Sequence, residues 1–240
     1  MSISFIVPAH NEAANIQACI QAIRLAAPGA EVVVVADACS DATAEIASRE
    51  GAVLVEVEHR HIAATRNAGA RAARGEILFF VDGDTRVTSA VVQAGRAALE
   101  AGAAGGGALF RFDRPIPAYA RVVEKLAALF CLLTQMSGGC ILFCSRSTFD
   151  RLGGFNTAIY AGEELDFAHR VKKIGRFRVV PQAVVTSGRK VRAYSGWELL
   201  RITWQVLWKG PRALYDRNGL ELWYERREEP HYPGKEKSRL

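Results

Sequence analysis

Two aspartates separated by one glycine are the residues whose types and spacing most directly suggest chemistry. Asp82 and Asp84 follow the apolar run 77–81, which is typical of a strand buried on both faces. Ligands of open α/β sheets collect beyond the carboxyl ends of the strands, where this pair stands. Two carboxylates so close repel each other unless a cation or hydrogen-bond donors neutralise them. Mg²⁺ or Mn²⁺, which bind one or two carboxylates together with phosphate oxygens, would suit the pair, and an ordinary Asp-Gly turn is the alternative.

Three strand–helix units precede this strand, so we expect a mainly parallel sheet with right-handed crossovers. The expected strands are 3–7, 31–36, 53–57 and 77–81, and the expected helices are 13–25, from 40 or 41 to about 50, and 63–73. Each loop from a strand to a helix then faces one crevice. The polar residues of these loops are Asn11, Glu12, Asp37, Asp41, Asp82 and Asp84. Helix capping would explain Asn11, Ser40 and Asp41, but not Asp37, which stands directly at a strand end.

The second half of the chain begins with a glycine-rich stretch, 102–107. It precedes a strand, so it is not a dinucleotide-binding loop. We expect strands at 108–112, 140–143, 178–180 and 183–186, and helices at 118–136, 148–152 and 162–174. Glu163, Glu164 and Asp166 fall in the first turn of the last helix, where stabilisation of the helix dipole is an alternative to catalysis.

Bulk composition describes a globular α/β chain with an anionic partner. Half of the 240 residues are hydrophobic and the net charge is +6, which suits a nucleotide or a phospholipid surface. Nucleic acid is discounted, because no ordered aromatic and basic platform is present. Five cysteines without a C-x-x-C pair predict reduced thiols and no zinc site. No basic segment precedes the first apolar run, and 126–136 is too short to span a bilayer, so we expect a cytoplasmic protein, either free or associated with the cytoplasmic face of the membrane.

A set of short motifs, taken in order, resembles family 2 glycosyltransferases of the GT-A fold over roughly residues 3–190. They are Val7–Glu12, Ala36–Thr43, Arg66–Ala70, Ala73–Glu76 leading into Asp82-Gly83-Asp84, Gly138-Gly139, Gly153-Gly154-Phe155, and Gly162–Asp166 with Arg170. The resemblance implies an α/β fold with a mixed, mainly parallel sheet between helices and a Rossmann-like nucleotide-binding half. It also implies that a sugar moves from a nucleotide diphosphate sugar, most simply a UDP-sugar, to an acceptor hydroxyl with inversion and with a divalent metal (Mn²⁺ or Mg²⁺).

The resemblance assigns roles to individual residues. The nucleotide site comprises Pro8, Ala9, Asn11, Glu12, Asp37, which would bond uracil, Arg66, Asn67, Asp82 and Gly83. Asp84, with Asp82, would bind the metal. Gly138 and Gly139 would lie at the acceptor or donor sugar. The acid pair after Gly162 would supply the general base, which must take the proton of the attacking hydroxyl.

Three departures from the family pattern bear on these roles. Ala36 stands where an acid usually precedes Asp37, so we expect that one contact on the uridine side is either missing or not needed. The base motif reads Glu163-Glu164; we assign the base to Glu164, with Glu163 and Asp166 as alternatives. The segment 186–188 replaces a metal-binding histidine, which predicts weaker metal affinity. The basic residues that follow, Arg189, Lys190 and Arg192, would fold over the diphosphate or form a solvated loop.

We divide the chain into a catalytic domain, 1–190, with a nucleotide-binding half at 1–104 and an acceptor-binding half at 105–190. An amphipathic helical extension, 191–224, and a charged tail, 225–240, follow. Trp197, Trp204 and Trp208 form a stripe on the extension. Packing against the domain or a second subunit would explain the stripe, and contact with a bilayer interface, which would suit a lipid-linked acceptor, is the alternative.

Other functions fit less well. A haloacid-dehalogenase-type phosphatase would use Asp82 as nucleophile, but Arg86 stands where that pattern needs Thr or Val. A sugar nucleotidyltransferase would need an N-terminal glycine-rich phosphate loop. A non-catalytic protein that binds nucleotide sugars or a lipid surface remains an alternative, because the base motif is altered and the histidine is missing.

Overall fold

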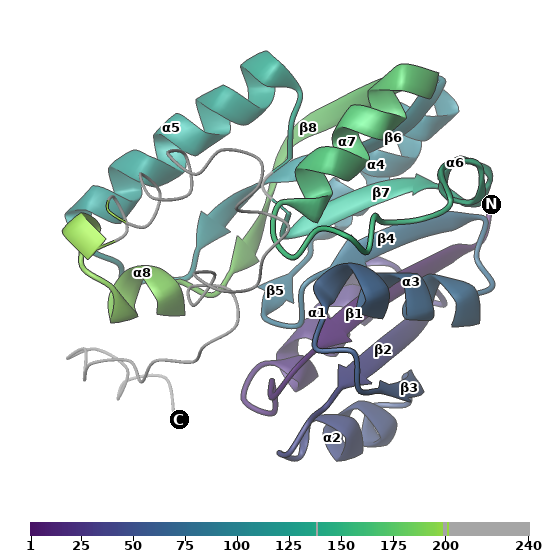
Figure 1. Ribbon diagram of the computed structural model, residues 1–240, viewed down its shortest axis with the longest axis horizontal. Coiled ribbons are helices and arrows are strands. Elements are labelled where there is room, and N and C mark those ends of the chain that lie inside the picture. Colours follow the sequence, from purple (N-terminus) through teal and green to yellow (C-terminus); the bar gives the residue numbers. More distant parts are fainter. Residues whose placement is uncertain (138, 199–200, 202–240) are drawn as a thin grey trace.

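The computed structural model describes residues 1–137, 139–198 and 201 (Figure 1). Its strands form one mixed sheet in the order β3-β2-β1-β4-β7-β6-β8-β5. The strands are β1 Ile3–Ala9, β2 Glu31–Asp37, β3 Val53–Val57, β4 Ile77–Val81, β5 Thr85–Arg86, β6 Ala103–Phe112, β7 Ile141–Ser145 and β8 Arg176–Thr186. The helices are α1 Ile16–Ala26, α2 Thr43–Arg49, α3 Ile62–Ala72, α4 Ser89–Glu100, α5 Ala118–Thr134, α6 Arg146–Leu152, α7 Glu163–Ile174 and α8 Arg189–Ala193. The predicted α/β class, with a mainly parallel sheet between helices, is confirmed.

Alternate residues of the central strands enter two separate cores, one on each face of the sheet. Phe5 and Phe79 pack in the layer that contains α1 and α4. Ile6 and Phe80 pack in the layer that contains α3, α6 and α7. All five residues of β4 are buried because helices cover both faces, which explains their continuous apolar run.

The carboxyl end of β4 is brought against the second half of the chain by antiparallel pairing with β7. Val81 lies opposite Ile141, and the amide of Asp82 donates to the carbonyl of Cys140 at 3.2 Å. The Asp-Gly-Asp segment therefore stands beside the Gly139–Cys140 turn, although 56 residues separate them in the chain.

The glycine-rich stretch belongs to β6 and is not a loop before it, contrary to our prediction of a strand at 108–112. Neighbouring strands pack too closely there for side chains. A Cβ on Gly106 would lie 2.0 Å from the carbonyl oxygen of Arg178, and one on Gly107 would lie 2.3 Å from Oγ of Ser137. The glycines allow β6 to fit between β7 and β8.

Two predicted short strands at 178–180 and 183–186 are one strand, β8. It continues through Pro181 because the register with β6 shifts between Ala108 and Leu109, which absorbs the residues that cannot pair. The helix α4, the strand β5 and the helix α8 were not predicted from sequence at all.

Helices α5 and α8 lie together at one side of the molecule (Figure 1). The Tyr119 hydroxyl of α5 lies 2.6 Å from the carbonyl oxygen of Val191 and 2.8 Å from that of Tyr194. The domain boundary that we placed at 190 falls inside α8, and the division at 104 falls inside β6. Trp197 is exposed, whereas Trp204, Trp208 and the charged tail lie outside the described residues.

Two features bear on the chain's surroundings. In the described part of the chain, no helix combines the length and the apolar character that crossing a bilayer requires. None of the five cysteines, all of which the structure describes, forms a disulfide.

Candidate active site

A cleft of about 730 Å³ opens where β1, β2 and β4 end. It gathers most of the residues singled out in the sequence, from loops that are far apart in the chain. The predicted residues that line it are Pro8, Ala9, Asn11, Glu12, Asp37, Arg66, Asp82, Gly83, Asp84, Gly139, Glu163, Glu164, Arg189 and Lys190. Acids, guanidinium groups and backbone therefore face one hollow.

Asp84 is the most enclosed member of the Asp-Gly-Asp pair. Its Oδ1 accepts from the Thr186 hydroxyl at 3.3 Å, and its Oδ2 lies 3.2 Å from Nη2 of Arg189. Burial raises the pKa of Asp84 to about 6, against the opposing effect of Arg189, and the nearby Asp82 and Glu12 raise it further. An additional cation near this carboxylate would be stabilised strongly.

Arg189, the first residue of α8, lines the cleft beside Asp84. It forms a two-pronged ion pair with Glu12, in which Nη1 lies 2.9 Å from Oε2, and it also contacts Asp84. Glu12 is held on its other side by the side-chain amide of Asn15 at 2.8 Å. The loop after β1 is thus tied to α8, although 177 positions separate the two residues.

Arg66 forms a buried ionic bridge across the floor of the cleft. Its Nη1 donates to Glu163 Oε1 at 2.5 Å, and its Nη2 donates to Asp82 Oδ1 at 2.9 Å and to the Gly139 carbonyl at 3.3 Å. The Arg66 side chain is 3% exposed and that of Glu163 is 5% exposed. Burial opposes the charge on Arg66, but the carboxylates of Glu163 and Asp82 raise its pKa overall.

Glu164 differs from its neighbour because no other side chain in the described part of the chain bonds to its carboxylate. Burial and the charge of Glu163 raise its pKa to about 8, although Arg66 acts in the opposite direction. The carboxylate lies against Gly139, where a Cβ would approach Oε1 to 3.1 Å. A general base requires a carboxylate whose pKa lies near neutrality and which is not already bonded to another side chain.

Asp37 is not the N-cap of α3, which is His61, but it holds the segment that leads into this helix. Its Oδ1 accepts from the Arg60 amide at 2.7 Å, and its Oδ2 accepts from the His61 amide at 3.2 Å and the Thr65 hydroxyl at 2.7 Å. A carboxylate has about four lone-pair positions, so one acceptor position on Oδ1 stays available to a ligand.

Three predicted site residues do not line the cleft. Asn67 exchanges two hydrogen bonds with the backbone of Phe155, at 2.9 and 2.8 Å, and so fixes a neighbouring loop. Asp166 pairs with Arg170 at 2.7 Å on the outer side of α7. Arg192 is buried against Asp113 at 2.7 Å. Gly138, predicted beside Gly139, lies outside the described residues.

Two residues with ring side chains line the cleft although we did not predict them: His61, in the loop after β3, and Tyr160, in the segment between α6 and α7. His61 and Tyr160 line the cleft near Asp37, with ring centroids 4.7 Å apart. The His61 Nε2 atom is buried and forms no hydrogen bond within the described part of the molecule. A sequence signal for His61 was available, because 58–61 is the third of the strand-to-helix loops that face the crevice.

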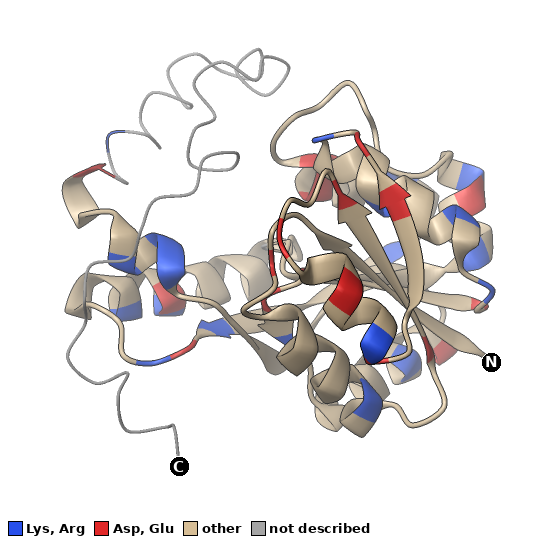
Figure 2. Ribbon diagram, turned by 90° about the horizontal axis from the view of Figure 1, so that it is seen from below, with Lys and Arg blue, Asp and Glu red and all other residues tan. Residues whose placement is uncertain are grey.

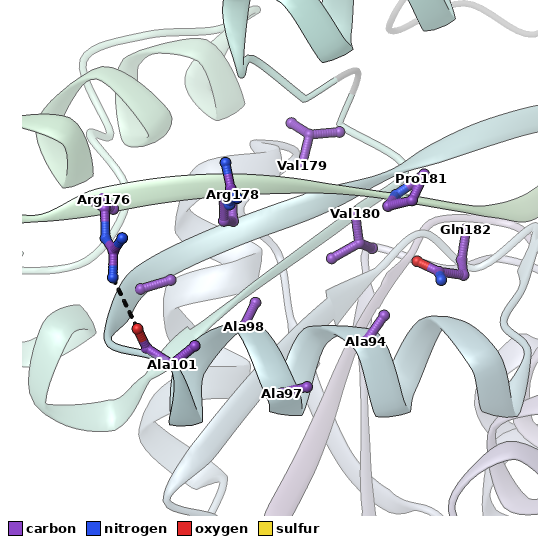
Figure 3. A pocket seen from close by; sticks show the side chains of 11 residues that line it. Ala94, Ala97, Ala98, Ala101, Arg176, Arg178, Val179, Val180, Pro181 and Gln182 are labelled. Carbon is purple, nitrogen blue, oxygen red and sulfur yellow. Dashed lines mark hydrogen bonds between the residues drawn. The ribbon is translucent and has the colours of Figure 1, made fainter.

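A second hollow, of about 540 Å³, lies between α4 and β8 on another part of the surface (Figure 3). Alanines of α4 form one wall, and Arg176 donates to the Ala101 carbonyl at 2.8 Å across its end. Its lining includes two cationic side chains, Arg176 and Arg178, but no carboxylate that could bind a metal ion or accept a proton. The chemistry belongs to the first cleft.

The carboxylates of the first cleft suit a hard divalent cation whose remaining ligands come from phosphate and water. Asp82 and Asp84 offer carboxylate oxygens, which Mg²⁺ and Mn²⁺ accept in combination with phosphate and water. Within the described residues, no group of three or more His, Cys, Asp or Glu side chains has the spacing of a complete metal cage. The cleft therefore suits a cation bound together with a phosphate compound, and the histidine expected by family analogy is replaced by Thr186.

Comparison with known proteins agrees with this geometry. The family model described as "Glycosyl transferase family 2" matches residues 4–144. Glycosyltransferase AglE of Haloferax volcanii is 38% identical over 91 residues, which cover 34% of this chain and 30% of that protein. Uncharacterized glycosyltransferase EpsJ of Bacillus subtilis is 34% identical over 97 residues, which cover 38% and 28%. The matched segments thus span less than a third of these relatives.

Solved structures share the fold at low identity. Mannosyltransferase PcManGT of Pyrobaculum calidifontis, in complex with GDP-Man and Mn²⁺, has a TM-score of 0.66 at 23% identity, over 83% of this chain and 59% of that one. Glucosyl-3-phosphoglycerate synthase of Mycobacterium tuberculosis, in complex with Mn²⁺, UDP and its product, has a TM-score of 0.62 at 21% identity, over 89% and 80%.

The fold and the cleft define the GT-A class of glycosyltransferase folds. Within that class, the chain belongs to glycosyl transferase family 2, because the family model matches more than half of its length. The phosphatase and nucleotidyltransferase alternatives are excluded by this membership.

Proposed function

We propose that this chain transfers a sugar from a nucleotide diphosphate sugar to an acceptor hydroxyl, in one displacement with inversion. The observation that carries the proposal is the arrangement of Asp37, Asp84 and Glu164 around one cleft, with Glu164 alone lacking a side-chain partner among the described residues. These are a candidate contact for the base, a candidate cation ligand and a candidate proton acceptor. Membership in the family supports the same reaction class.

We propose UDP as the nucleotide. The open acceptor position on Asp37 Oδ1 suits the N3–H of uracil, and His61 and Tyr160 offer rings beside it for a planar base. Pro8 and Ala9 supply backbone at the opposite wall. Related structures contain either UDP or GDP-Man, so the identity of the base rests on these contacts in the present chain.

In this mechanism Glu164 takes the proton of the acceptor hydroxyl as the hydroxyl attacks the anomeric carbon, and the bond from that carbon to the diphosphate breaks. Arg66 fixes Glu163 and Asp82 by donating a hydrogen bond to each. The negative charge of Glu163 favours proton uptake by Glu164. A divalent cation bound at Asp84 and Asp82 would neutralise charge on the leaving nucleoside diphosphate.

We assign Arg189 and Lys190 to the diphosphate. Both line the cleft beside Asp84, and Arg189 is held there only by carboxylates that a cation would also attract. Arg192 is not part of this assignment, because its guanidinium is committed to Asp113.

We further propose a lipid-linked acceptor and a location at the cytoplasmic membrane surface. The support is the exposure of Trp197, 76%, beside α8.

Replacing Asp84 with asparagine is expected to weaken binding of UDP in the presence of Mn²⁺ at least about 10-fold, since even indirect partners of a bound metal contribute that much. Isothermal titration of UDP, with and without Mn²⁺, measures the effect. The matched control is Asp150→Asn, which alters an exposed aspartate on α6 and should change nothing. Wild-type protein that binds no UDP with Mn²⁺, or an Asp84→Asn variant that binds it normally, would end the proposal. UDP binding without turnover of any donor would favour the non-catalytic alternative.

Replacing Arg189 with glutamine is expected to separate the affinities for cation and nucleotide. UDP should bind about 10-fold more weakly, because a hydrogen bond to a charged group contributes roughly 1.5–3 kcal/mol. Mn²⁺ alone should bind more tightly, since Asp84 and Glu12 lose their competing guanidinium. Titration of Mn²⁺ followed by electron paramagnetic resonance measures the second effect, with Arg71→Gln on α3 as the exposed control. A parallel fall in both affinities would contradict the assignment.

A further inference from the structure

Helix α5 presents an apolar face to the outside of the molecule. Of the twelve large hydrophobic side chains that are exposed in the described residues, seven belong to this one helix of 17 residues. They are Val122, Val123, Leu126, Leu129, Phe130, Leu132 and Leu133, with exposed fractions from 39% to 76%. Scattered exposed hydrophobic residues are normal, but a contiguous set on one helix marks an interaction surface.

The spacing of these residues makes the face continuous. Val122, Leu126, Leu129 and Leu133 recur at intervals of four, three and four positions, which places them in one row along the helix. The opposite side of α5 is committed to the protein, where Ala120 and Cys131 are buried. We call the seven outward residues the α5 apolar face.

The charges on α5 are distributed unequally between its two sides. Arg121 and Lys125 are exposed at the margin of the α5 apolar face. Glu124, the acid of this helix, is turned inward, where it accepts from the Phe112 amide at 2.9 Å and from Arg114 at 3.0 Å. Figure 2 marks Lys and Arg in blue and Asp and Glu in red along the ribbon, and blue segments are visible at the left of that view. The outward surface therefore combines apolar side chains with positive charge and carries no acid from α5.

Trp197 extends the same surface toward the C-terminal side. Gly196 lies directly against the ring of Tyr119 at the start of α5, where a Cβ would come within 3.3 Å of it. Trp197 follows immediately and is 76% exposed. Tryptophan beside an apolar and basic helix face is typical of a segment at the headgroup level of a bilayer.

We propose that the α5 apolar face, with Arg121, Lys125 and Trp197, docks on the surface of a membrane that contains anionic phospholipid. Leucine, valine and phenylalanine side chains enter the boundary between headgroups and acyl chains, while the long basic side chains reach the phosphates. The anionic headgroups supply the charge that complements Arg121 and Lys125.

The docked helix would also bring the bilayer next to the reacting groups. Phe112, just before α5, and Gly139, just after it, both line the cleft, and Gly139 lies against Glu164. An acceptor held in the bilayer would then reach the cleft on the side of the proposed base. This consequence rests on the proposed sugar transfer, whereas membrane docking does not.

The test is co-sedimentation of the full chain with phosphatidylcholine vesicles, with and without phosphatidylglycerol. The wild-type protein should bind the anionic vesicles, and the double variant Leu126→Glu/Leu133→Glu should bind at least about 10-fold more weakly. The control is Leu25→Glu/Val53→Glu, which places the same two charges at exposed apolar positions on α1 and β3 and should bind like the wild type. Arg121→Gln/Lys125→Gln should lose only the added affinity for phosphatidylglycerol.

Three outcomes would overturn the inference. The first is wild-type protein that sediments with neither kind of vesicle, and the second is equal binding by the wild type and the Leu126→Glu/Leu133→Glu variant. The third is a wild-type protein that is a dimer in solution and a Leu126→Glu/Leu133→Glu variant that is a monomer with unchanged affinity for vesicles. A second copy of the chain would then cover the α5 apolar face. If the Leu126→Glu/Leu133→Glu variant unfolds, the Arg121→Gln/Lys125→Gln variant still tests the proposal. Loss of its added affinity for vesicles with phosphatidylglycerol would support docking, and an unchanged added affinity would contradict it. Sugar transfer in detergent is unaffected by any of these results, so the two proposals fail separately.

Discussion

Replacing Glu164 with glutamine is expected to lower kcat by about 10²–10⁴-fold, the range that a positioned general base contributes. Glutamine keeps the size of the side chain and its contact with Gly139 but cannot take a proton. Binding of UDP and Mn²⁺ should be unchanged, because Glu164 contacts neither in the proposed mechanism. Steady-state kinetics with a panel of nucleotide sugars, together with titration of UDP, separates the two quantities.

The alternative bases provide the matched controls. Asp166→Asn should leave kcat nearly unchanged, because Asp166 faces away from the cleft and pairs with Arg170. Glu163→Gln should lower the stability of the protein, since Glu163 is committed to Arg66, and should also lower the pKa of Glu164, because the neighbouring negative charge is lost. Turnover that survives in Glu164→Gln but disappears in Asp166→Asn would show that the base is misassigned.

The pH dependence gives a second, independent check on Glu164. Its pKa is raised to about 8, chiefly by burial and then by Glu163, so the carboxyl is largely protonated below that pH. A protonated base cannot accept the hydroxyl proton, hence kcat/KM should rise about 10-fold per pH unit up to about 8 and level off above it. A profile that is flat between pH 6 and about 8 would contradict the role, on the same reasoning.

Replacing Arg66 with methionine is expected to lower the free energy of unfolding by about 3–5 kcal/mol, because breaking a buried ion pair leaves a charge without compensation. Glu163 would lose the one side-chain partner that it has among the described residues, and Asp82 would lose its ion pair with Arg66. Methionine fills much of the same volume, so the loss of charge dominates the change. Urea denaturation at constant pH measures it.

Arg49→Met is the control for this substitution. Arg49 pairs with Glu45 on α2, and both side chains are about two-thirds exposed, so the expected change is within about 1 kcal/mol. If Arg66→Met cost no more than this control, the buried bridge would not be what holds the cleft together, and the dependence of Glu164 on Arg66 and Glu163 would need another cause.

The sequence alone was sufficient for the features that depend on local pattern. The run 77–81 could only be a strand covered on both faces, and the residues that follow it had to stand at the carboxyl edge of the sheet. The same logic brought Asp37, Glu12 and Asp84 to one cleft, because parallel strands end at one edge. The prediction failed at the glycine-rich segment 102–107. A loop and a strand packed closely between two others are both rich in glycine, so composition does not distinguish them.

Only the tertiary structure determined which charged side chains form ion pairs with each other. Arg66 pairs with Glu163 across 97 positions, and Arg189 pairs with Glu12 across 177, and no local periodicity encodes either contact. These pairings leave Glu164 as the acid of its helix that enters the cleft without a side-chain partner in the described structure. Adjacent glutamates look equivalent in a sequence, but Glu163 is bound by the buried guanidinium of Arg66, whereas burial and the charge of Glu163 raise the pKa of Glu164 to about 8.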